Sequence, residues 1–385
     1  MRPVCQRRQA QRSWRSYAAS NQMLKAVTWT VLLGCLSALV TAMLLPAEAG
    51  AAGLHPGGQE APESGAPIFS LGKPINLGGG DGAKALAIAP NGKTAYVVLG
   101  SALTTVNIAT GKVGPRIELG EHNFADSIAF APDGSTAYVI GETGSPTAAG
   151  WLMPIAVPSN RVGTPIPLGV GEQPEGQGPS SLAITQDGKW AYVTVFGDDS
   201  VVPVDLATRR AGRPIRLPSG SGPSAIAIGP SGRTAYVTDE GTSALTAVNL
   251  ASGRPGAAIS MGAREAPDAV AVAPDGTTVY VADHYGYIVP VSTAKNKPEK
   301  AIYLGGVTAP DALAVTPDGR WALVDNLAGG DSTVTPFATA TGKTGTSLSL
   351  GLASYSYDIA IAPDGKTAYA LTAYPSGLVP ITITP

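Results

Sequence analysis

The chain has 385 residues, of which 44% are apolar and 14% are charged, and its formal net charge is −2. This composition can build a large buried core and excludes an intrinsically disordered protein. Six basic residues and one acid precede Ala49, so the remaining body has 20 basic and 27 acidic residues and a net charge of −7. An acidic body argues against a nucleic-acid partner.

The first 49 residues predict an export signal. Residues 26–45 carry no charge, follow a basic segment, and precede the small residues Ala47 and Ala49 of a cleavage site. The same run is long enough to remain uncleaved as a membrane anchor with its basic side inside. We therefore expect a secreted or cell-surface protein. Both cysteines, Cys5 and Cys35, lie in this segment, so the exported body has no disulfide.

Residues 50–70 are rich in Gly, Ala, Pro and Glu without periodicity and predict a flexible spacer. The domain that follows, residues 71–385, repeats one pattern seven times, most clearly in residues 268–283 (DAVAVAPDGTTVYVAD). Each copy has a turn that ends in Gly, and successive turns are 42, 54, 44, 44, 43 and 46 residues apart. The turns are Asn91-Gly92, Asp133-Gly134, Asp187-Gly188, Ser231-Gly232, Asp275-Gly276, Asp318-Gly319 and Asp364-Gly365.

Every repeat has the pattern of two β-hairpins. A short apolar run such as residues 270–272 leads into the turn, and a Thr-Ala-Tyr-Val type of segment leads out of it. A second pair of strands follows, joined by a turn such as Ser252-Gly253-Arg254. Four antiparallel strands repeated seven times predict an all-β, seven-bladed β-propeller. Five third strands carry Pro at the same place, where we expect a bulge or an unpaired amide: Pro154, Pro203, Pro290, Pro336 and Pro380.

The last repeat, from Asp358 to the end of the chain, lacks a fourth strand. Residues 74–78 (PINLG) match the fourth strands of other repeats, such as residues 115–120, but no hairpin precedes them. We therefore expect this amino-terminal strand to complete the last blade and close the ring.

Two motifs carry a resemblance to a known family. The Tyr-Val-Thr-Asp of residues 236–239 and the Ala-Pro-Asp-Gly of residues 273–276 resemble the YVTN family of β-propeller repeats, and the resemblance covers residues 74–385. It implies an exported, surface-layer-type ring in which the first strand of each blade is innermost. Similar seven-bladed rings include lactonases and streptogramin lyases, so the resemblance is specific for the fold and weak for the function.

This strand order sorts the loops to two faces. The turn face holds the Asp-Gly and Thr-Gly-Lys turns, and the acidic face holds the loops between blades and between second and third strands. Most acids of the ring fall on the acidic face, and most Lys and Arg residues fall on the turn face. Such a field would concentrate cations at the acidic face. The basic turn face offers a contact for anionic wall polymer or membrane lipid.

The densest acidic neighbourhood spans the fourth to sixth repeats. We expect a protein, a glycan or a small cationic ligand there, and the candidate binding residues are Asp239, Glu240, Asp268, Asp283, His284, Tyr285, Asp311, Asn326 and His122. No cofactor is required, but a divalent cation such as calcium would take oxygen ligands from Asp239, Asp268, Asp283 and Asp311. Alternatively, these aspartates cap strand amides or form Asx-turns. The five aspartates in the turns themselves are assigned to turn geometry: Asp133, Asp187, Asp275, Asp318 and Asp364.

The chain has few residues and motifs that are typical of a catalytic site. Only His122 and His284 fall in the ring, and neither a Gly-x-Ser-x-Gly elbow nor a metal-spaced His pair is present. In an enzyme, His284 would be the base, with Asp283 and Asp239 beside it; the alternative is an exposed loop histidine. Large aromatic residues that recur at strand positions are expected to pack between blades: Tyr96, Tyr138, Tyr192, Tyr236, Tyr280, Tyr369, Trp190 and Trp321.

The favoured function is therefore a binding or interaction module at the cell envelope that uses the acidic face. The alternative is a divalent-metal-assisted lyase or lactone hydrolase, and a further alternative is a structural surface-layer component.

Overall fold

The structure is a computed structural model that describes residues 67–78, 82–121, 123–144, 149–170, 177–262, 266–305, 308–328, 331–352, 356–373 and 375–384. The expected signal or anchor, the spacer up to residue 66 and His122 lie outside the described residues. Within those ranges, no helix combines the length and the apolar character needed to span a bilayer.

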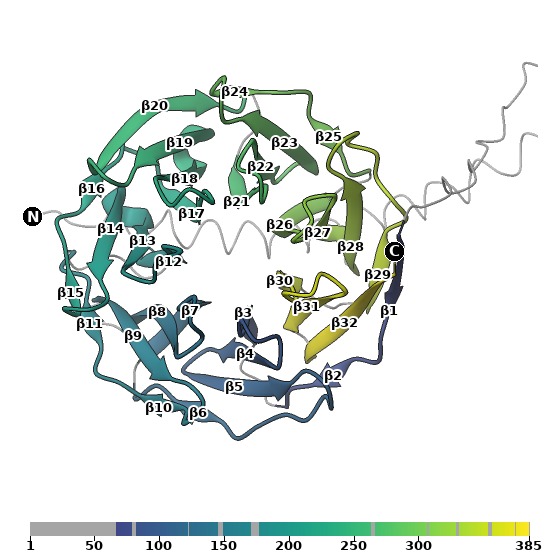
Figure 1. Ribbon diagram of the computed structural model, residues 1–385, viewed down its shortest axis with the longest axis horizontal. Helices are drawn as coiled ribbons and strands as arrows, with labels where there is room; N and C mark the ends of the chain where they lie inside the picture. The colour runs from purple at the N-terminus through teal and green to yellow at the C-terminus, as the bar shows by residue number, and fades with distance from the viewer. Residues whose placement is uncertain are drawn as a thin grey trace, which may run out of the picture. The chain divides into compact units, whose positions relative to one another are not determined.

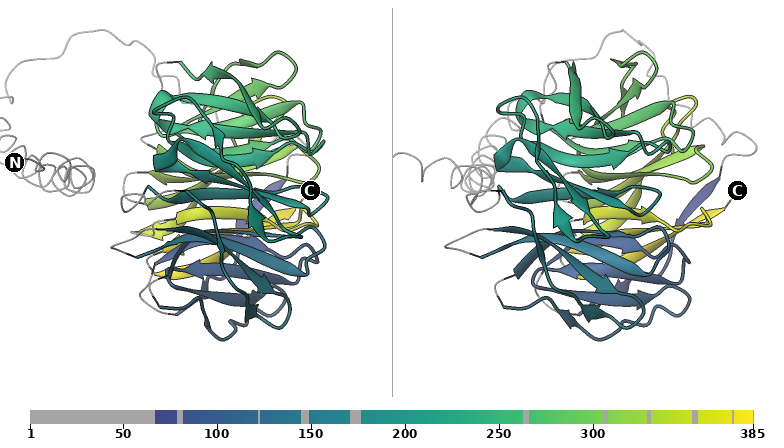
Figure 2. Two further views of the ribbon diagram at one scale, coloured as in Figure 1. Left: turned by 90° about the vertical axis from the view of Figure 1, so that its left-hand side faces the viewer. Right: turned by 60° about the vertical axis from the view of Figure 1, so that its left-hand side comes forward.

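The described strands form seven antiparallel sheets around a central axis, which confirms the seven-bladed β-propeller (Figure 1). In each blade the first strand is innermost and the later strands follow outward, as the resemblance implied. Seen from the side, the strands run between two opposite faces of the ring (Figure 2).

Blade 1 contains β3 (Ala83–Ile88), β4 (Thr94–Leu99), β5 (Ala102–Asn107) and β6 (Ile117–Glu118). Blade 2 contains β7 (Asn123–Phe130), β8 (Thr136–Thr143), β9 (Gly150–Ala156), β10 (Arg161–Val162) and β11 (Ile166–Pro167). Blade 3 contains β12 (Pro179–Ile184), β13 (Trp190–Val195), β14 (Ser200–Asp205), β15 (Arg210–Ala211) and β16 (Ile215–Arg216). Blades 4 and 5 contain β17 (Pro223–Ile228), β18 (Thr234–Asp239), β19 (Ala244–Asn249) and β20 (Arg254–Ser260); β21 (Pro267–Val272), β22 (Thr278–Asp283), β23 (Tyr287–Ser292), β24 (Lys297–Pro298) and β25 (Ile302–Tyr303). Blades 6 and 7 contain β26 (Thr308–Val315), β27 (Trp321–Ala328), β28 (Asp331–Ala338) and β29 (Leu348–Leu352); β30 (Ser356–Ile361), β31 (Thr367–Ala373), β32 (Ser376–Thr384), β1 (Ile68–Leu71) and β2 (Ile75–Asn76). Two short 3-10 helices, η2 (Phe196–Asp198) and η3 (Glu240–Thr242), join second and third strands in blades 3 and 4.

The first hairpin of each blade turns where the sequence predicts. In blade 5, Asp275 Oδ1 accepts a hydrogen bond of 2.9 Å from the backbone N–H of Thr277, and Gly276 has a φ of +72°, which favours glycine. The same side-chain bond recurs at Asp133, Asp187, Asp318 and Asp364, which confirms that these five aspartates serve turn geometry.

The turns also link neighbouring blades. A Cβ atom added to Gly134 of blade 2 would lie 3.5 Å from Pro90 of blade 1, and one added to Gly92 of blade 1 would lie 3.7 Å from Pro363 of blade 7. The Pro and the Gly of the repeated motif therefore pack against each other across blade boundaries, including the boundary where the ring closes.

The amino-terminal segment completes blade 7. β2 pairs with residues 377–378 of β32, and β1 pairs with the carboxy-terminal end of the same strand. This pairing confirms that residues 74–78 contribute the missing strand. The predicted spacer is wrong for residues 68–70, which lie in β1, because β32 has nine residues and its far end offers backbone groups that β2 does not reach.

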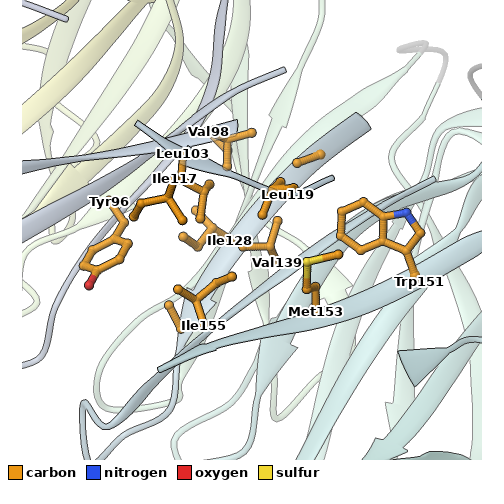
Figure 3. Packing of buried hydrophobic residues seen from close by; sticks show 13 residues of the cluster. Tyr96, Val98, Leu103, Ile117, Leu119, Ile128, Val139, Trp151, Met153 and Ile155 are labelled. Carbon is orange, nitrogen blue, oxygen red and sulfur yellow. The ribbon is translucent and has the colours of Figure 1, made fainter. Parts of the chain in front are cut away.

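Most of the core lies between blades. Figure 3 shows the seam between blades 1 and 2, where side chains of both sheets interdigitate: Tyr96, Val98, Leu103, Ile117, Leu119, Ile128, Val139, Trp151, Met153 and Ile155. Tyr96 packs edge-on against Phe130 of the next blade, with ring centroids 5.2 Å apart. The other recurrent tyrosines are buried or half-buried, as predicted for packing between blades: Tyr138, Tyr192, Tyr236, Tyr280 and Tyr369.

The two tryptophans differ. Trp321 of blade 6 packs against Phe69 of β1, with ring centroids 5.5 Å apart, and thus joins blade 6 to blade 7 as predicted. Trp190 is 37% exposed, so the prediction that it packs between blades is wrong. Both tryptophans are the first residues of their strands, β13 and β27, but Trp321 has Phe69 of the added strand β1 beside it.

The prolines of the third strands interrupt the outer strand. Pro154 keeps its place opposite Tyr138 in the ladder, and its carbonyl accepts a hydrogen bond of 2.8 Å from the N–H of Gly163. The fourth strand is broken next to it, into β10 and β11. The expected irregularity therefore lies in the outermost strand and not in the third strand.

Candidate functional site

The observed strand order places the loops on the two faces that the sequence predicted, but the charges are less completely separated. Arg216 lies at the acidic-face end of β16 and forms an ion pair with Asp198, with Nη1 and Oδ1 2.6 Å apart. Several aspartates lie at the turn face among the basic residues: Asp133, Asp187, Asp205, Asp275, Asp318 and Asp364. The acidic face keeps its excess of carboxylates.

A β-bulge recurs near the acidic-face end of the innermost strand in every described blade. At this point two residues of the first strand oppose one residue of the second strand, which re-aims the bulged side chain. The bulged residues, which we call the bulge ring, are Lys84, Asp126, Ser180, Ser224, Asp268, Asp311 and Tyr357.

Members of the bulge ring contact the neighbouring innermost strand. Ser180 Oγ donates to the carbonyl of Pro223 in the next blade at 2.8 Å. Lys84 Nζ forms an ion pair with Asp126 Oδ1 at 2.7 Å, again between adjacent blades. The bulge ring therefore lies along the seams between the innermost strands, near the axis of the propeller.

Blade 5 brings a histidine onto the bulge ring. His284 Nδ1 lies 3.3 Å from Oδ2 of Asp268, and the two side chains are 51% and 25% exposed. The hydrogen bond with Asp268 is the main cause that raises the pKa of His284, and the charges of Asp311 and Glu240 raise it further. Burial and the charge of Asp268 raise the pKa of Glu240. Four predicted site residues therefore share one electrostatic environment.

Blade 6 adds two carboxyl groups. Burial, together with the charge of Asp268, raises the pKa of Asp311 to about 7. Asp325 is 0% exposed, and its carboxyl is faced by the side chain of Ser356 and the backbone N–H of Asn326. Burial raises the pKa of Asp325 well above its ordinary value, and the charges of Asp311 and Asp358 add to this.

Blade 7 contributes Asp358, one residue after the bulge. Its Oδ2 accepts from the N–H of Leu86 in blade 1 and its Oδ1 from the N–H of Ile359, each at 2.8 Å. Burial raises its pKa to about 7, although both hydrogen bonds act in the opposite direction. We call the linked residues of blades 4 to 7 the axial acidic cluster: Glu240, Asp268, His284, Asp311, Asp325 and Asp358.

The predicted residues at the ends of the second strands are buried and do not join this cluster. Asp239 Oδ2 accepts a hydrogen bond from Thr246 Oγ1 at 2.5 Å, and burial raises the pKa of Asp239 to about 6. Asp283 Oδ1 accepts from the N–H of Tyr285 at 2.7 Å, which is the Asx-turn that the alternative interpretation expected. Asn326 donates to Thr333 Oγ1 at 2.7 Å.

The structure thus brings only some of the predicted site residues together. It brings together Glu240, Asp268, His284 and Asp311, leaves Tyr285 exposed next to His284, and buries Asp239, Asp283 and Asn326. The sequence reasoning did not single out Asp325 or Asp358 as site residues. Alignment of the repeats carried a signal for Asp325, because the equivalent positions in blades 3 and 4 are Thr194 and Thr238 and only blade 6 has an acid there. Within the described residues, no group of three or more His, Cys, Asp or Glu side chains is arranged to hold a metal ion.

The described residues define a seven-bladed β-propeller with acidic side chains concentrated at one end of its innermost strands. A family model described as Lactonase, 7-bladed beta-propeller, matches residues 164–349, just under half of the chain. Among solved structures, hydrazine synthase of Kuenenia stuttgartiensis has a TM-score of 0.66 at 19% sequence identity, with 78% of this chain and 95% of that chain covered. This likeness shows a shared fold alone. No curated protein matches the chain significantly.

Proposed function

We propose that the protein is an exported binding module whose axial acidic cluster holds a small cationic ligand. The observation that carries this proposal is the placement of Asp268 and Asp311 at adjacent bulges, partly open to solvent. Within the described part of the chain, no Lys or Arg forms an ion pair with either of them. His284 is the one cationic partner of Asp268, so carboxylates outnumber cationic groups in this partly desolvated part of the described chain, and such an excess attracts a positively charged group.

The state of His284 favours binding over catalysis. Its pKa is raised above the ordinary value of 6.5, so a larger fraction of the imidazole is protonated near neutral pH. A protonated imidazole cannot accept a proton and is a poor general base. The protonated His284 partly neutralises Asp268 instead. Asp311 is then the carboxylate of the two whose charge is less neutralised.

Titration of the purified protein with spermidine and with calcium chloride, by calorimetry at constant ionic strength, tests the proposal. We expect heat of binding with at least one of these cations, and we expect Asp268→Asn and Asp311→Asn each to weaken it by about tenfold or more. Arg216→Gln is a matched control, because Arg216 lies on the same face but pairs with Asp198 outside the cluster. No heat with either cation, or equal affinity in all variants, would reject the proposal.

A lactone hydrolase is the second candidate, and one observation favours it. The residues matched by the lactonase family model run from the end of blade 2 through blade 6 and contain His284, Asp268 and Asp311. In this case His284, oriented by Asp268, would activate a water molecule for attack on the ring carbonyl. Release of acid from a panel of five- and six-membered lactones, measured for the wild type and for His284→Ala, separates the two functions. Only a hydrolase would show turnover that the substitution abolishes.

A further inference from the structure

Blade 5 differs from blades 1, 3 and 4 at two paired positions near the acidic face. Tyr287 is the first residue of β23 and lies opposite Tyr303 of β25. The residues equivalent to Tyr287 are small and buried: Ala102, Ser200 and Ala244. The residues equivalent to Tyr303 are polar and exposed: Glu118, Arg216 and Ser260. Two large aromatic side chains therefore replace a small residue and a polar residue of the repeat.

The two tyrosine rings contact each other at the surface. Their centroids are 5.0 Å apart, the ring planes are tilted by 40°, and Tyr303 is 52% exposed. Tyr287 is half-buried and lies on the same side of β23 as Val289, because side chains alternate along a strand. Val289 belongs to a core cluster with Ile259 of blade 4. The tyrosine pair therefore lies on the side of blade 5 that faces blade 4.

A third tyrosine links this pair to the axial acidic cluster. Tyr285 is 54% exposed, and its ring lies edge-on to that of His284 with centroids 6.3 Å apart. Asp283 Oδ1 accepts a hydrogen bond of 2.7 Å from the N–H of Tyr285 and thereby holds the turn between β22 and β23. We call Tyr285, Tyr287 and Tyr303 the tyrosine patch. A hydrogen-bonded turn and a paired strand position its members before any ligand binds, which lowers the entropic cost of binding.

The tyrosine patch fits a small ligand that has both an apolar face and hydroxyl groups. Each tyrosine offers an apolar ring face and a hydroxyl that can donate and accept hydrogen bonds. Three side chains are few beside the roughly 20–30 residues that each partner contributes to a stable protein interface. A pyranose ring has the matching chemistry, because its C–H face can pack on an aromatic ring while its hydroxyls bond to the tyrosine hydroxyls.

The charge of the acidic face selects among sugars. Carboxyl groups outnumber the single imidazole in the axial acidic cluster, which the patch meets at His284. Their field repels uronic acids and sugar phosphates and attracts a sugar that carries an ammonium group. An ammonium group also interacts favourably with the face of an aromatic ring. The rings and the surrounding charge therefore favour the same class of ligand.

We propose that the tyrosine patch is a stacking subsite for an oligosaccharide of amino sugars. One sugar ring packs on Tyr287 and Tyr303, and an ammonium group of the chain is drawn toward the carboxylates of the axial acidic cluster. The preference for a charged sugar rests on the proposed binding function, whereas the stacking on the tyrosines does not.

Calorimetry at about pH 6 with three trisaccharides tests the inference. The probes are the linear trimer of glucosamine, the corresponding trimer of N-acetylglucosamine, and trigalacturonic acid. We expect the glucosamine trimer to bind most tightly and trigalacturonic acid not to bind. The double variant Tyr287→Ala with Tyr303→Ser copies Ala244 and Ser260 of blade 4, so we expect it to fold. It should weaken the binding of both glucosamine-based trimers by about tenfold.

Phe124→Ser is the matched control, because Phe124 is 46% exposed at the acidic-face end of β7 in blade 2, outside the patch. This variant should bind both glucosamine-based trimers as the wild type does. Equal affinity of the wild type and the double variant, no heat from either of these trimers, or tighter binding of trigalacturonic acid would overturn the inference, whether or not spermidine binds.

The two neutral and charged arms separate this inference from the proposed function. If both glucosamine-based trimers bind equally, and Asp268→Asn and Asp311→Asn leave that affinity unchanged, the preference for a charged sugar and the proposed cation site both fail. Loss of binding of the N-acetylglucosamine trimer in the double variant would still support the stacking subsite, because that probe carries no charge.

Discussion

Replacing Leu77 with Ala tests the closure of the ring by the amino-terminal segment. Leu77 is 7% exposed and belongs to a cluster that joins residues of blade 1, such as Leu86, to residues of blade 7, such as Leu378. Truncating a buried Leu costs about 2–5 kcal/mol, because the lost methyl groups leave a cavity. With an unfolding entropy of roughly 2 cal/mol/K per residue over roughly 320 residues, a loss of about 3 kcal/mol lowers Tm by roughly 5 °C.

Ile68→Ala is the matched control in the same segment. Ile68 is 67% exposed, so its truncation should change the free energy of unfolding by less than about 0.5 kcal/mol. Calorimetry gives Tm, and urea unfolding followed by tryptophan fluorescence gives the free energy. If both variants melt with the wild type, or both lose the same small amount, the reasoning that Leu77 fastens blade 7 to blade 1 is refuted.

Three further predictions concern the carboxylates. Stability should fall as the pH rises from about 4 to about 7, because burial raises the pKa of Asp311 and Asp358 to about 7 and the folded chain keeps protons that the unfolded chain has released. Below pH 4 the trend should reverse, since hydrogen bonds lower the pKa of the turn aspartates and the stability that these bonds provide is lost on protonation. Thermal melts at constant ionic strength measure Tm in both pH ranges. A Tm that rises from pH 4 to 7 would contradict the predicted fall in stability. Asp358→Ala should cost about 1–3 kcal/mol in urea unfolding, because it leaves the N–H of Leu86 without its acceptor; an unchanged midpoint would show that water replaces the carboxylate. Lys84→Met should cost less than about 1 kcal/mol in the same assay, since its ion pair with Asp126 is open to solvent, and a larger loss would indicate that the pair holds the two innermost strands together.

The repeated sequence was sufficient to predict the architecture, because the residues that define a blade act locally. Asp275 and Gly276 form the turn through a side-chain bond and a positive φ that involve only adjacent residues. The PINLG segment at residues 74–78 was recognisable as a fourth strand because it repeats a pattern seen elsewhere in the chain. The extension of that strand to Ile68 was not predictable, since it depends on how far β32 projects beyond β2.

The site was only half predictable from the sequence. The excess of acids on one face follows from strand order, and this was enough to select Asp268, His284 and Asp311. Which of the acidic side chains on this face lie close together depends on the recurring bulge and on the contacts between adjacent innermost strands. The turn at Asp283 is local, because its carboxylate accepts the N–H of Tyr285 two residues on, whereas tertiary structure alone decided that Asp325 is fully buried. The fold is thus determined by local chemistry repeated seven times, whereas the site is determined by the few blades that depart from the repeat.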